Sequence, residues 1–253
     1  MLLRPCVCSL GALLLSATVL AQTFEAAAVK PSAPGNLNGS TFEYLTGGGL
    51  RVLNGTLRGL IESAYDIREF QVVGGPGWLS TDLFDVQARS QSSQSQTSRA
   101  DDMRATRLKL RTLLADRFRL VLHHDTRELQ QYVLKVDKGG PRLVAAGSDP
   151  PTTGRTGILS TCGHMTGTFA AMTNLTVYLS RQLRLPVVDA TGLTARYNFE
   201  LSWTPELSPC ADATENAPAI FTALQEQLGL KLESSKGPSD VLVIDAAEKP
   251  SAD

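Results

Sequence analysis

The sequence predicts an α+β protein with two related lobes, each a small mixed or antiparallel sheet with two helices packed on one face. Two observations predict this fold. Segments with the apolar spacing of amphipathic helices alternate with segments that have the two-residue spacing of half-buried strands. The order helix, strand, helix, strand, turn, strand in the first half also recurs in the second half. We therefore expect an N-terminal lobe over residues 24–145, an inter-lobe segment over 146–159 and a C-terminal lobe over 160–250.

In the first lobe, apolar residues from Leu57 to Tyr65 predict a helix that Thr56 can cap. Residues 70–75 and 84–89 are predicted strands, separated by a turn at 75–78. A polar, low-complexity linker covers 90–100, and a second helix follows from about 101 to 116. Residues 118–122 and 132–136 then predict a hairpin that turns at 125–128.

In the second lobe, apolar spacing predicts helices over 172–183 and 220–228 and a strand over 197–202. Residues 186–188 form a short extended run. Residues 228–232 and 241–244 predict a second hairpin, with a turn at 236–238. The repeat is clearest when 113–122 is set beside 223–232, and 84–88 beside 197–201.

Composition limits the classes of function. The chain has 253 residues, 42% of them hydrophobic, so it can bury a sizeable core. Its 24 Lys and Arg nearly balance its 25 Asp and Glu, for a formal net charge of −1. Nucleic-acid binding is therefore not expected, because the chain lacks the basic surface that supplies most of that affinity.

Residues 1–21 have the pattern of a signal peptide. Arg4 precedes an apolar core from Val7 to Leu20, and the small Val19 and Ala21 suit a signal-peptidase site. We expect cleavage after Ala21, export to the periplasm or beyond, and no membrane span afterwards. An uncleaved anchor helix is the alternative.

Export affects the cysteines. After cleavage, Cys162 and Cys210 are the two that stay in the chain. In an oxidising compartment they suggest one disulfide, which closes roughly 50 residues and contributes about 2–4 kcal/mol. Two unpaired thiols are the alternative.

Candidate reactive groups are few. His123, beside His124 and Asp125, and the pair Cys162 and His164 are the most reactive-looking residues. Adjacent His residues on a strand point to opposite faces, so we expect these polar side chains to lie at the end of a hairpin and to form no metal site. The chain contains no nucleophile elbow, zincin helix or phosphate loop. We expect no cofactor and lean against an enzyme.

Trp78 and Trp203 both stand beside predicted strand ends. They could line a ligand groove, although packing against the sheet also explains two such side chains.

Long segments of the chain carry a family resemblance, among them LRGLIESAYDIREFQVVGGPGWL, LLADRFRLVLHHDTRELQQYVLKVDKGGPRL and LPVVDATGLTARYNF. The chain resembles the soil-associated domain-of-unknown-function family, exported proteins abundant as paralogues in soil acidobacteria. The resemblance covers nearly everything after residue 21. It implies export, and some members look fused to, or encoded near, a membrane-anchored sensor peptidase of the beta-lactam-receptor type. It supplies no catalytic residue.

A second, fold-level likeness concerns the helix that ends in a Leu-Gly-Leu step at 228–230, followed by the predicted hairpin. This resembles the short N-terminal domain of secretins and TonB-dependent receptors, small modules that mediate protein contacts in the periplasm.

Together these observations predict a non-enzymatic binding or interaction module of the cell envelope, with an envelope or secreted protein as a candidate partner. The alternative is a secreted hydrolase or peptidase-associated sensory factor that uses His123, Cys162 or His164 in an inter-lobe cleft.

Overall fold

The computed structural model describes residues 22–33, 39–90, 98–152, 154–205 and 217–250. The first half contains β1 (Ala26–Pro31), β2 (Thr41–Tyr44), β3 (Leu50–Thr56), α1 (Leu57–Tyr65), η1 (Glu69–Gln71), β4 (Val72–Gly74), η2 (Gly77–Ser80), β5 (Leu83–Arg89), α2 (Arg99–Phe118) and β6 (Val121–Val136). The second half contains β7 (Val144–Ala145), β8 (Gly157–Thr161), β9 (His164–Ala170), α3 (Met172–Leu183), β10 (Val187–Asp189), β11 (Tyr197–Ser202), α4 (Ile220–Ala223), η3 (Leu224–Leu228) and β12 (Leu230–Ala246). The 3-10 turns are η1 and η2, and η3 is a π-helical continuation of α4.

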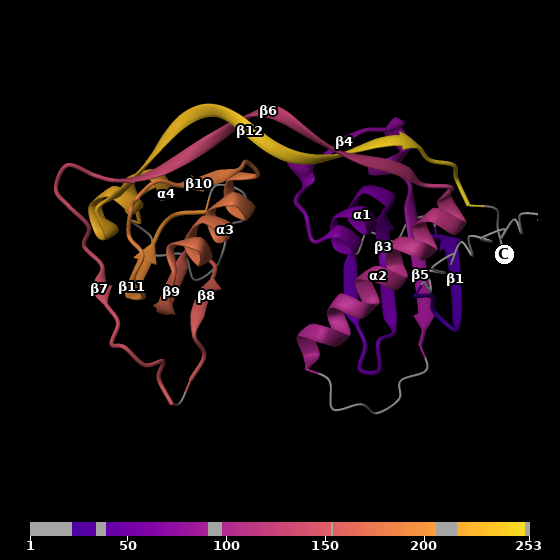
Figure 1. The fold of residues 1–253 in the computed structure, drawn as a ribbon, viewed down its shortest axis with the longest axis horizontal. Coiled ribbons are helices and arrows are strands. Elements are labelled where there is room, and N and C mark those ends of the chain that lie inside the picture. Colours follow the sequence, from indigo (N-terminus) through magenta and orange to yellow (C-terminus); the bar gives the residue numbers. More distant parts are fainter. Residues whose placement is uncertain (1–21, 34–38, 91–97, 153, 206–216, 251–253) are drawn as a thin grey trace, which may run out of the picture.

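Two lobes lie on the same side of a long two-stranded ribbon formed by β6 and β12 (Figure 1). The N-terminal lobe has an antiparallel sheet in the order β1-β5-β3-β2, with α1 and α2 packed against it. The C-terminal lobe has an antiparallel sheet in the order β7-β11-β9-β8, with α3 and α4–η3 packed against it. The predicted α+β class with two related lobes is therefore confirmed.

The two lobes repeat each other down to single residues. Asn54 in β3 and Phe169 in β9 both adopt a positive φ, at 52° and 49°, and both stand where the strand register shifts. Asn54 N donates to the Asp85 carboxylate at 2.9 Å, and Phe169 N donates to the Asn198 side-chain oxygen at 2.8 Å. The same β-bulge, with an acceptor on the same neighbouring strand, occurs in both lobes. Such a match indicates duplication of one β-β-β-α-β-β-α-β unit.

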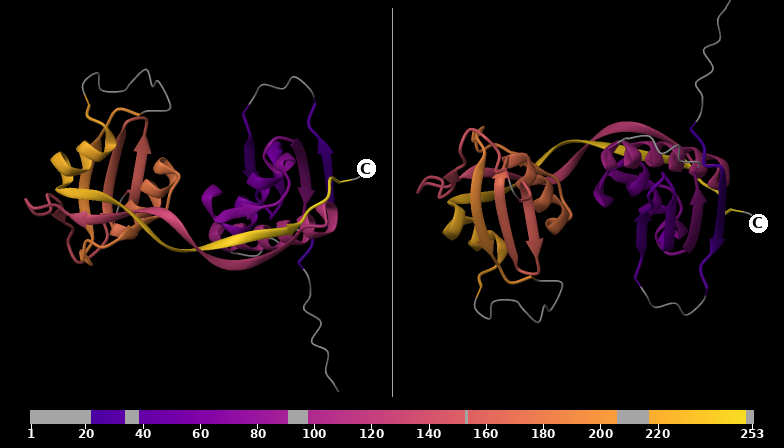
Figure 2. Two further views of the ribbon diagram at one scale, coloured as in Figure 1. Left: turned by 90° about the horizontal axis from the view of Figure 1, so that it is seen from above. Right: turned by 90° about the horizontal axis from the view of Figure 1, so that it is seen from below.

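The ribbon exchanges strands between the lobes. β6 and β12 pair antiparallel along almost their whole length, with Glu128 opposite Pro238 near the middle (Figure 2). In the C-terminal lobe, β10 adds in parallel to β6, whereas in the N-terminal lobe β4 adds in parallel to β12. The last strand of each half therefore leaves its own lobe and completes the other one.

The two predicted hairpins are wrong. Neither 125–128 nor 236–238 turns, because β6 and β12 are continuous strands that pair with each other and not with themselves. The polar residues that resemble turns lie where the ribbon crosses between the lobes and is mostly exposed. Gly237 fits there because a Cβ would lie only 2.3 Å from the Gln131 side-chain nitrogen, which occupies that space.

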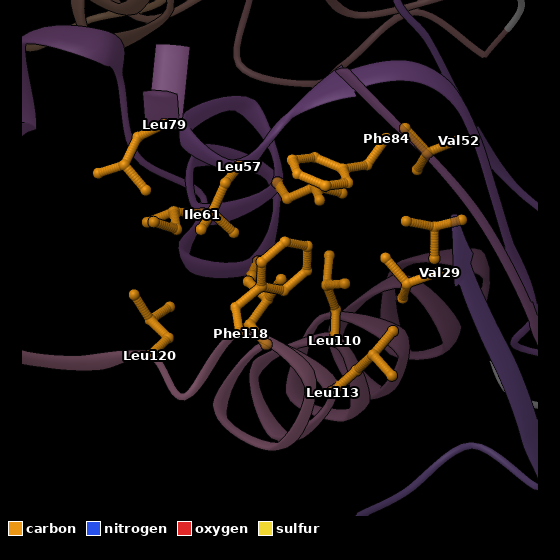
Figure 3. Packing of buried hydrophobic residues seen from close by; sticks show 14 of the residues in the cluster. Val29, Val52, Leu57, Ile61, Leu79, Phe84, Leu110, Leu113, Phe118 and Leu120 are labelled. Carbon is orange, nitrogen blue, oxygen red and sulfur yellow. The ribbon is translucent and has the colours of Figure 1, made fainter. Parts of the chain in front are cut away.

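Each lobe has its own core, and the ribbon contributes to both. In the N-terminal lobe, Phe84 and Phe118 meet edge to face, with ring centroids 5.1 Å apart (Figure 3). Leu242 and Ile244 of β12 also belong to this core, although they come from the end of the sequence. Leu134 of β6 belongs to the core of the C-terminal lobe. The cores therefore depend on chain segments from both halves.

The predicted helices are confirmed, with changes at their ends. Thr56 caps α1 by accepting a hydrogen bond from Gly59 N at 3.1 Å, as expected. Ser98 caps α2, which runs from Arg99 to Phe118 and so extends beyond the predicted bounds. Strands β5, β10 and β11 are confirmed, while the strand expected over 70–75 is shortened to β4 by the preceding 3-10 turn.

Strands β1, β2, β3, β7, β8 and β9 were not predicted. Among them, β8 begins within the segment expected to join the lobes. Residues 1–21 and most of the polar linker lie outside the described residues. In the part that is described, no helix is long and apolar enough to cross a membrane.

Candidate functional site

A cavity of about 200 Å³ opens in the C-terminal lobe, where the β8–β9 turn meets the end of α3 and the start of α4. We call it the C-lobe cavity. Its walls combine apolar and aromatic side chains with a few polar ones, which is the usual character of a small-ligand pocket. The described lining residues are Thr161, Cys162, Gly163, Gln182, Leu183, Trp203, Thr204, Pro205, Ile220 and Phe221.

Trp203 is the largest side chain in this wall and is held from several directions. Its backbone N donates to Gly163 O at 2.8 Å, which extends the sheet by one bond beyond β11. Gly163 has φ +71°, and a Cβ there would lie 2.6 Å from Trp203 O, so only glycine fits this close approach. The indole ring packs edge to face on Tyr178 at 6.0 Å and is only 4% exposed. The ring is therefore a fixed wall.

A short polar chain lies behind the cavity. Gln182 Nε2 donates to Tyr178 Oη at 2.7 Å, and Tyr178 Oη lies 2.7 Å from Ser160 Oγ. These bonds tie α3 to β8 and hold the aromatic ring that supports Trp203. The arrangement can orient a ligand through polar groups at the rim while its apolar part lies against the aromatic wall.

The N-terminal lobe, which has the same fold, differs from the C-terminal lobe at the position of this cavity. In the N-terminal lobe, Gly48 corresponds to Gly163, with φ +75°, and a Cβ there would meet the Lys109 and Ser90 side chains. Lys109 Nζ donates to Ser90 Oγ and so fills the matching position. A separate space of about 330 Å³ remains nearby, but it is lined in part by the charged Arg99 and Asp102. In the part of the N-terminal lobe that the structure describes, the position that matches the aromatic cavity is therefore filled by Lys109.

The helices account for this difference. In the repeat, Ile220 at the start of α4 is equivalent to Leu110 in the middle of α2, and both are buried. Lys109, which directly precedes Leu110 in α2, is equivalent to Ala219, the residue before α4, and the alanine methyl group is too short to fill the cavity as the lysine side chain does.

The candidate histidines are not brought together. His123 lies on β6 at the N-terminal lobe, with its Nδ1 2.9 Å from Asp245 Oδ2 and a side chain that is 54% exposed. His164 lies on β9 in the C-terminal lobe, with its Nδ1 2.9 Å from Ser202 Oγ and its Nε2 3.4 Å from Thr166 Oγ1. A catalytic triad needs a carboxylate and a hydroxyl beside the same histidine. Here the carboxylate lies beside His123 and the hydroxyl lies beside His164.

Asp125, next to the histidine pair, is used within the ribbon. Arg127 Nε donates to its carboxylate at 3.0 Å, and Thr126 N donates at 2.8 Å. The arginine bond, followed by the backbone bond, lowers the pKa of the Asp125 carboxyl below its usual value. Across the described residues, no group of three His, Cys, Asp or Glu side chains could hold a metal ion.

The two tryptophans lie in different lobes. Trp78 packs on the N-terminal core, 6.4 Å from the Phe84 ring, and Lys249 Nζ lies 5.7 Å from its centroid. Trp203 lies in the C-terminal core. The structure therefore does not join them in one groove, but it does bring Trp203 and Cys162 to one cavity. Cys210 lies outside the described residues.

Sequence reasoning missed several residues of these sites. In the sequence, Ile220 and Phe221 were interpreted as part of the buried face of a helix. No feature of the sequence around Gln182 indicated a binding site. Ser202 and Asp245, the partners of the two histidines, also carried none, since both pairings join strands that are distant in the sequence.

The fold and cavity define a class: a two-lobed α+β protein made by duplication, with exchanged terminal strands and an aromatic cavity in one lobe. The family follows from comparison with known proteins. A family model described as a protein of unknown function, DUF3738, matches residues 58–247, so the chain belongs to this family. No curated protein and no solved structure matches it.

Proposed function

We propose that this protein is an exported, non-enzymatic binding module whose C-lobe cavity takes a small apolar group of a ligand or partner protein. The observation that carries the proposal is the aromatic cavity beside Trp203, whose counterpart in the N-terminal lobe is filled by Lys109. A dry cavity of about 150 Å³ is enough to bind benzene. A cavity of about 200 Å³ therefore suits one aromatic ring or one branched aliphatic group.

Trp203 itself can report the binding. The chain has two tryptophans, so a Trp78→Phe variant leaves Trp203 as the single indole fluorophore. Titration with p-cresol should then change the Trp203 emission in a saturable way. Thr161→Phe, which places a ring at the cavity mouth, should abolish the change. Thr46→Phe, the equivalent substitution in the N-terminal lobe, is the control and should leave it intact. An emission that never saturates, or that responds equally in both variants, argues against the proposal.

The alternative function is hydrolysis, and one contact favours it. His164 Nδ1 lies 2.9 Å from Ser202 Oγ, a distance at which an imidazole could take the hydroxyl proton. Ser202 is also clasped by Gln227, which accepts from its backbone N at 2.9 Å and donates to its O at 2.8 Å. A panel of fluorogenic esters and peptides tests this alternative. Turnover that is lost in both His164→Ala and Ser202→Ala would establish it over the binding module.

Export is part of the proposal, supported by the charged start, apolar core and small residues of 1–21. So is a disulfide between Cys162 and Cys210: Cys162 lies at the cavity beside Pro205, which shortly precedes Cys210 in the sequence. The bond would brace the cavity wall in an oxidising compartment. Peptide mapping of the exported protein without reduction tests both claims. The first residue found tests cleavage of residues 1–21, and a peptide that joins Cys162 to Cys210 tests the disulfide.

A periplasmic or secreted partner fits the proposed compartment. The likeness to the short N-terminal domain of secretins and TonB-dependent receptors supports a role in protein contacts, and the likeness to soil acidobacterial paralogues supports a set of related binders. Pull-down from the envelope fraction with the wild-type chain and with Thr161→Phe would identify a partner that uses the cavity.

A further inference from the structure

A second cavity, of about 320 Å³, lies between the two lobes beside the ribbon, and we call it the inter-lobe cavity. The N-terminal lobe contributes Asp66, Arg68 and the 3-10 turn η1, and the C-terminal lobe contributes one side of α3 and the start of β10. The ribbon contributes Ser239 and Asp240 of β12. Clefts between domains are common places for small ligands to bind.

The walls of this cavity are held in place by hydrogen bonds. Gln71 Nε2, at the end of η1, donates to Asp240 O at 3.0 Å, which fixes the N-terminal lobe to the ribbon. Val187 N donates to Ser180 Oγ at 2.9 Å, which fixes β10 to α3. The groups that line the cavity are therefore positioned before a ligand arrives, and this lowers the cost of binding.

Two opposite charges in the lining have no ion partner in the described part of the chain. Asp66 is neutralised, because Arg107 donates to both of its carboxylate oxygens, at 2.8 and 2.9 Å. The ion pairs among the described residues include neither Arg68 nor Asp240. The Asp240 carboxylate accepts one long hydrogen bond, from Thr126 Oγ1 at 3.4 Å. A ligand can therefore supply the counter-charge for one guanidinium and one carboxylate of the cavity.

The alternation of β12 directs Asp240 toward the lobes. Asp240 precedes Leu242 and Ile244 at alternate positions of the strand, and these two residues pack in the N-terminal core. Alternate residues of a strand share one face, and the register with β6 is regular from Asp240 to Ile244. The carboxylate therefore lies on the lobe side of the ribbon. Arg68, half-buried between α1 and η1, brings the guanidinium from the N-terminal lobe.

The cavity also offers apolar surface to a ligand. Its apolar lining residues are Phe70, Val177, Pro186 and Val187. Val177 is 47% exposed, so an apolar group bound beside it would remove its methyl groups from water. A cavity of about 150 Å³ already holds benzene, and this one is about 320 Å³. It therefore has room for a charged head and a branched aliphatic group together.

We propose that the inter-lobe cavity binds a free α-amino acid with an apolar side chain. Its carboxylate is bound by the Arg68 guanidinium and its ammonium group by the Asp240 carboxylate, while its side chain lies against Phe70 and Val177. A guanidinium and a carboxylate match in shape, so their hydrogen bonds are bidentate and charge-assisted. A zwitterion neutralises both groups at once, whereas an anion neutralises only Arg68 and a cation only Asp240. The bound amino acid contacts both lobes and the ribbon, and so ties them together.

Calorimetric titration of the protein near neutral pH and at constant ionic strength tests the proposal, with leucine and two analogues that each lack one charge. Isocaproate lacks the ammonium group of leucine, and isoamylamine lacks its carboxylate. We expect leucine to bind saturably with Kd of about 1 mM or tighter, and to raise the melting temperature. Each analogue should bind at least about tenfold more weakly, since it loses one charge-assisted contact.

Substitutions at the two charged positions should affect the analogues differently. Asp240→Asn should weaken leucine binding about tenfold without weakening isocaproate binding, because isocaproate has no group that pairs with this carboxylate. Arg68→Gln should weaken leucine binding about tenfold without weakening isoamylamine binding, for the corresponding reason. A general disturbance of the fold would weaken every ligand alike. Asp245→Asn on the same strand and Arg127→Gln on the ribbon remove charges outside the cavity, and both should bind leucine as wild type does.

The proposal is overturned if leucine does not bind saturably, if either analogue binds as tightly as leucine, or if the two cavity variants bind leucine as the controls do. It is also overturned if either cavity variant weakens all three ligands alike. Thr161→Phe, which places a ring at the mouth of the C-lobe cavity, should bind leucine as wild type does, and loss of binding there would place leucine in the C-lobe cavity instead. Emission from Trp203 reports p-cresol in the C-lobe cavity, so failure here is distinct from failure of the proposed function.

Discussion

Strand exchange makes a clear prediction: a substitution near the C-terminus should destabilise the N-terminal lobe. Ile244 on β12 is 5% exposed, packs in the N-terminal core and pairs with Gly74 of β4. Replacing a buried Ile with Ala costs about 2–5 kcal/mol, because apolar burial is lost and a cavity remains. We therefore expect Ile244→Ala to lower the free energy of unfolding of the N-terminal lobe by an amount in that range.

The repeat supplies a matched variant. Leu134 on β6 is equivalent to Ile244, is fully buried, and packs in the C-terminal core while pairing with Asp189 of β10. Leu134→Ala should therefore destabilise the C-terminal lobe by a similar amount, although Leu134 belongs to the first half of the chain.

Hydrogen–deuterium exchange resolved by peptide separates the two effects. For Ile244→Ala, exchange should accelerate in α1, β3 and β5, and for Leu134→Ala it should accelerate in α3, β9 and β11. The reasoning is refuted if Ile244→Ala loosens the C-terminal lobe first, or if Leu134→Ala loosens the N-terminal lobe first.

Three further predictions concern single positions. Gly229→Ala should lower the free energy of unfolding by more than about 1 kcal/mol, since Gly229 has φ +64° and a Cβ would lie 2.1 Å from Gly140 O. The equivalent substitution Arg119→Gly should leave the free energy of unfolding unchanged or raise it, because Arg119 has φ +47°, which glycine adopts readily. Chemical denaturation of both variants compares the two effects. Hydrogen bonds from Lys135 and Lys231 lower the pKa of the Glu233 carboxyl to about 2. The ionised carboxylate therefore stabilises the fold at pH values above the unfolded pKa, and this contribution is lost as pH falls through about 2. An NMR titration of the Glu233 carboxyl with a midpoint near about 4 would contradict the prediction. Asp245→Asn should change stability by less than about 1 kcal/mol, because its pair with a half-exposed histidine is at the surface.

The duplication could be predicted from the sequence because it depends on local patterns. The alignment of 84–88 with 197–201 matches the structural register, since Gly55 pairs with Phe84 just as Ala170 pairs with Tyr197. The alignment of 113–122 with 223–232 places Arg119 over Gly229, and both residues end their helices with a positive φ. Helix spacing and strand alternation survive in each copy, so they identify the repeat.

The strand exchange could not be predicted in the same way. A polar segment containing Gly237 and Pro238 has the composition of a turn, and it has the same composition when it crosses between two lobes as an exposed ribbon. Only the pairing partner distinguishes the two, and pairing between β6 and β12 joins residues about one hundred positions apart.

The candidate site was predicted only in part. Trp203 and Cys162 were singled out for their residue type, but their meeting depends on where α4 begins relative to the β8–β9 turn. No local pattern carries that information. For Trp78 and Trp203, residue type left two alternatives open, a ligand groove or packing against the sheets, and the two residues pack with different cores.

Methyl NMR of isoleucine-labelled protein tests the central claim most directly. Ile220 lines the C-lobe cavity, while Ile61 is buried in the N-terminal core. Titration with p-cresol should shift the Ile220 methyl resonance in a saturable way and leave Ile61 unchanged. Shifts of equal size at both residues, or none at Ile220, would contradict the assignment of the aromatic cavity in the C-terminal lobe as the binding site.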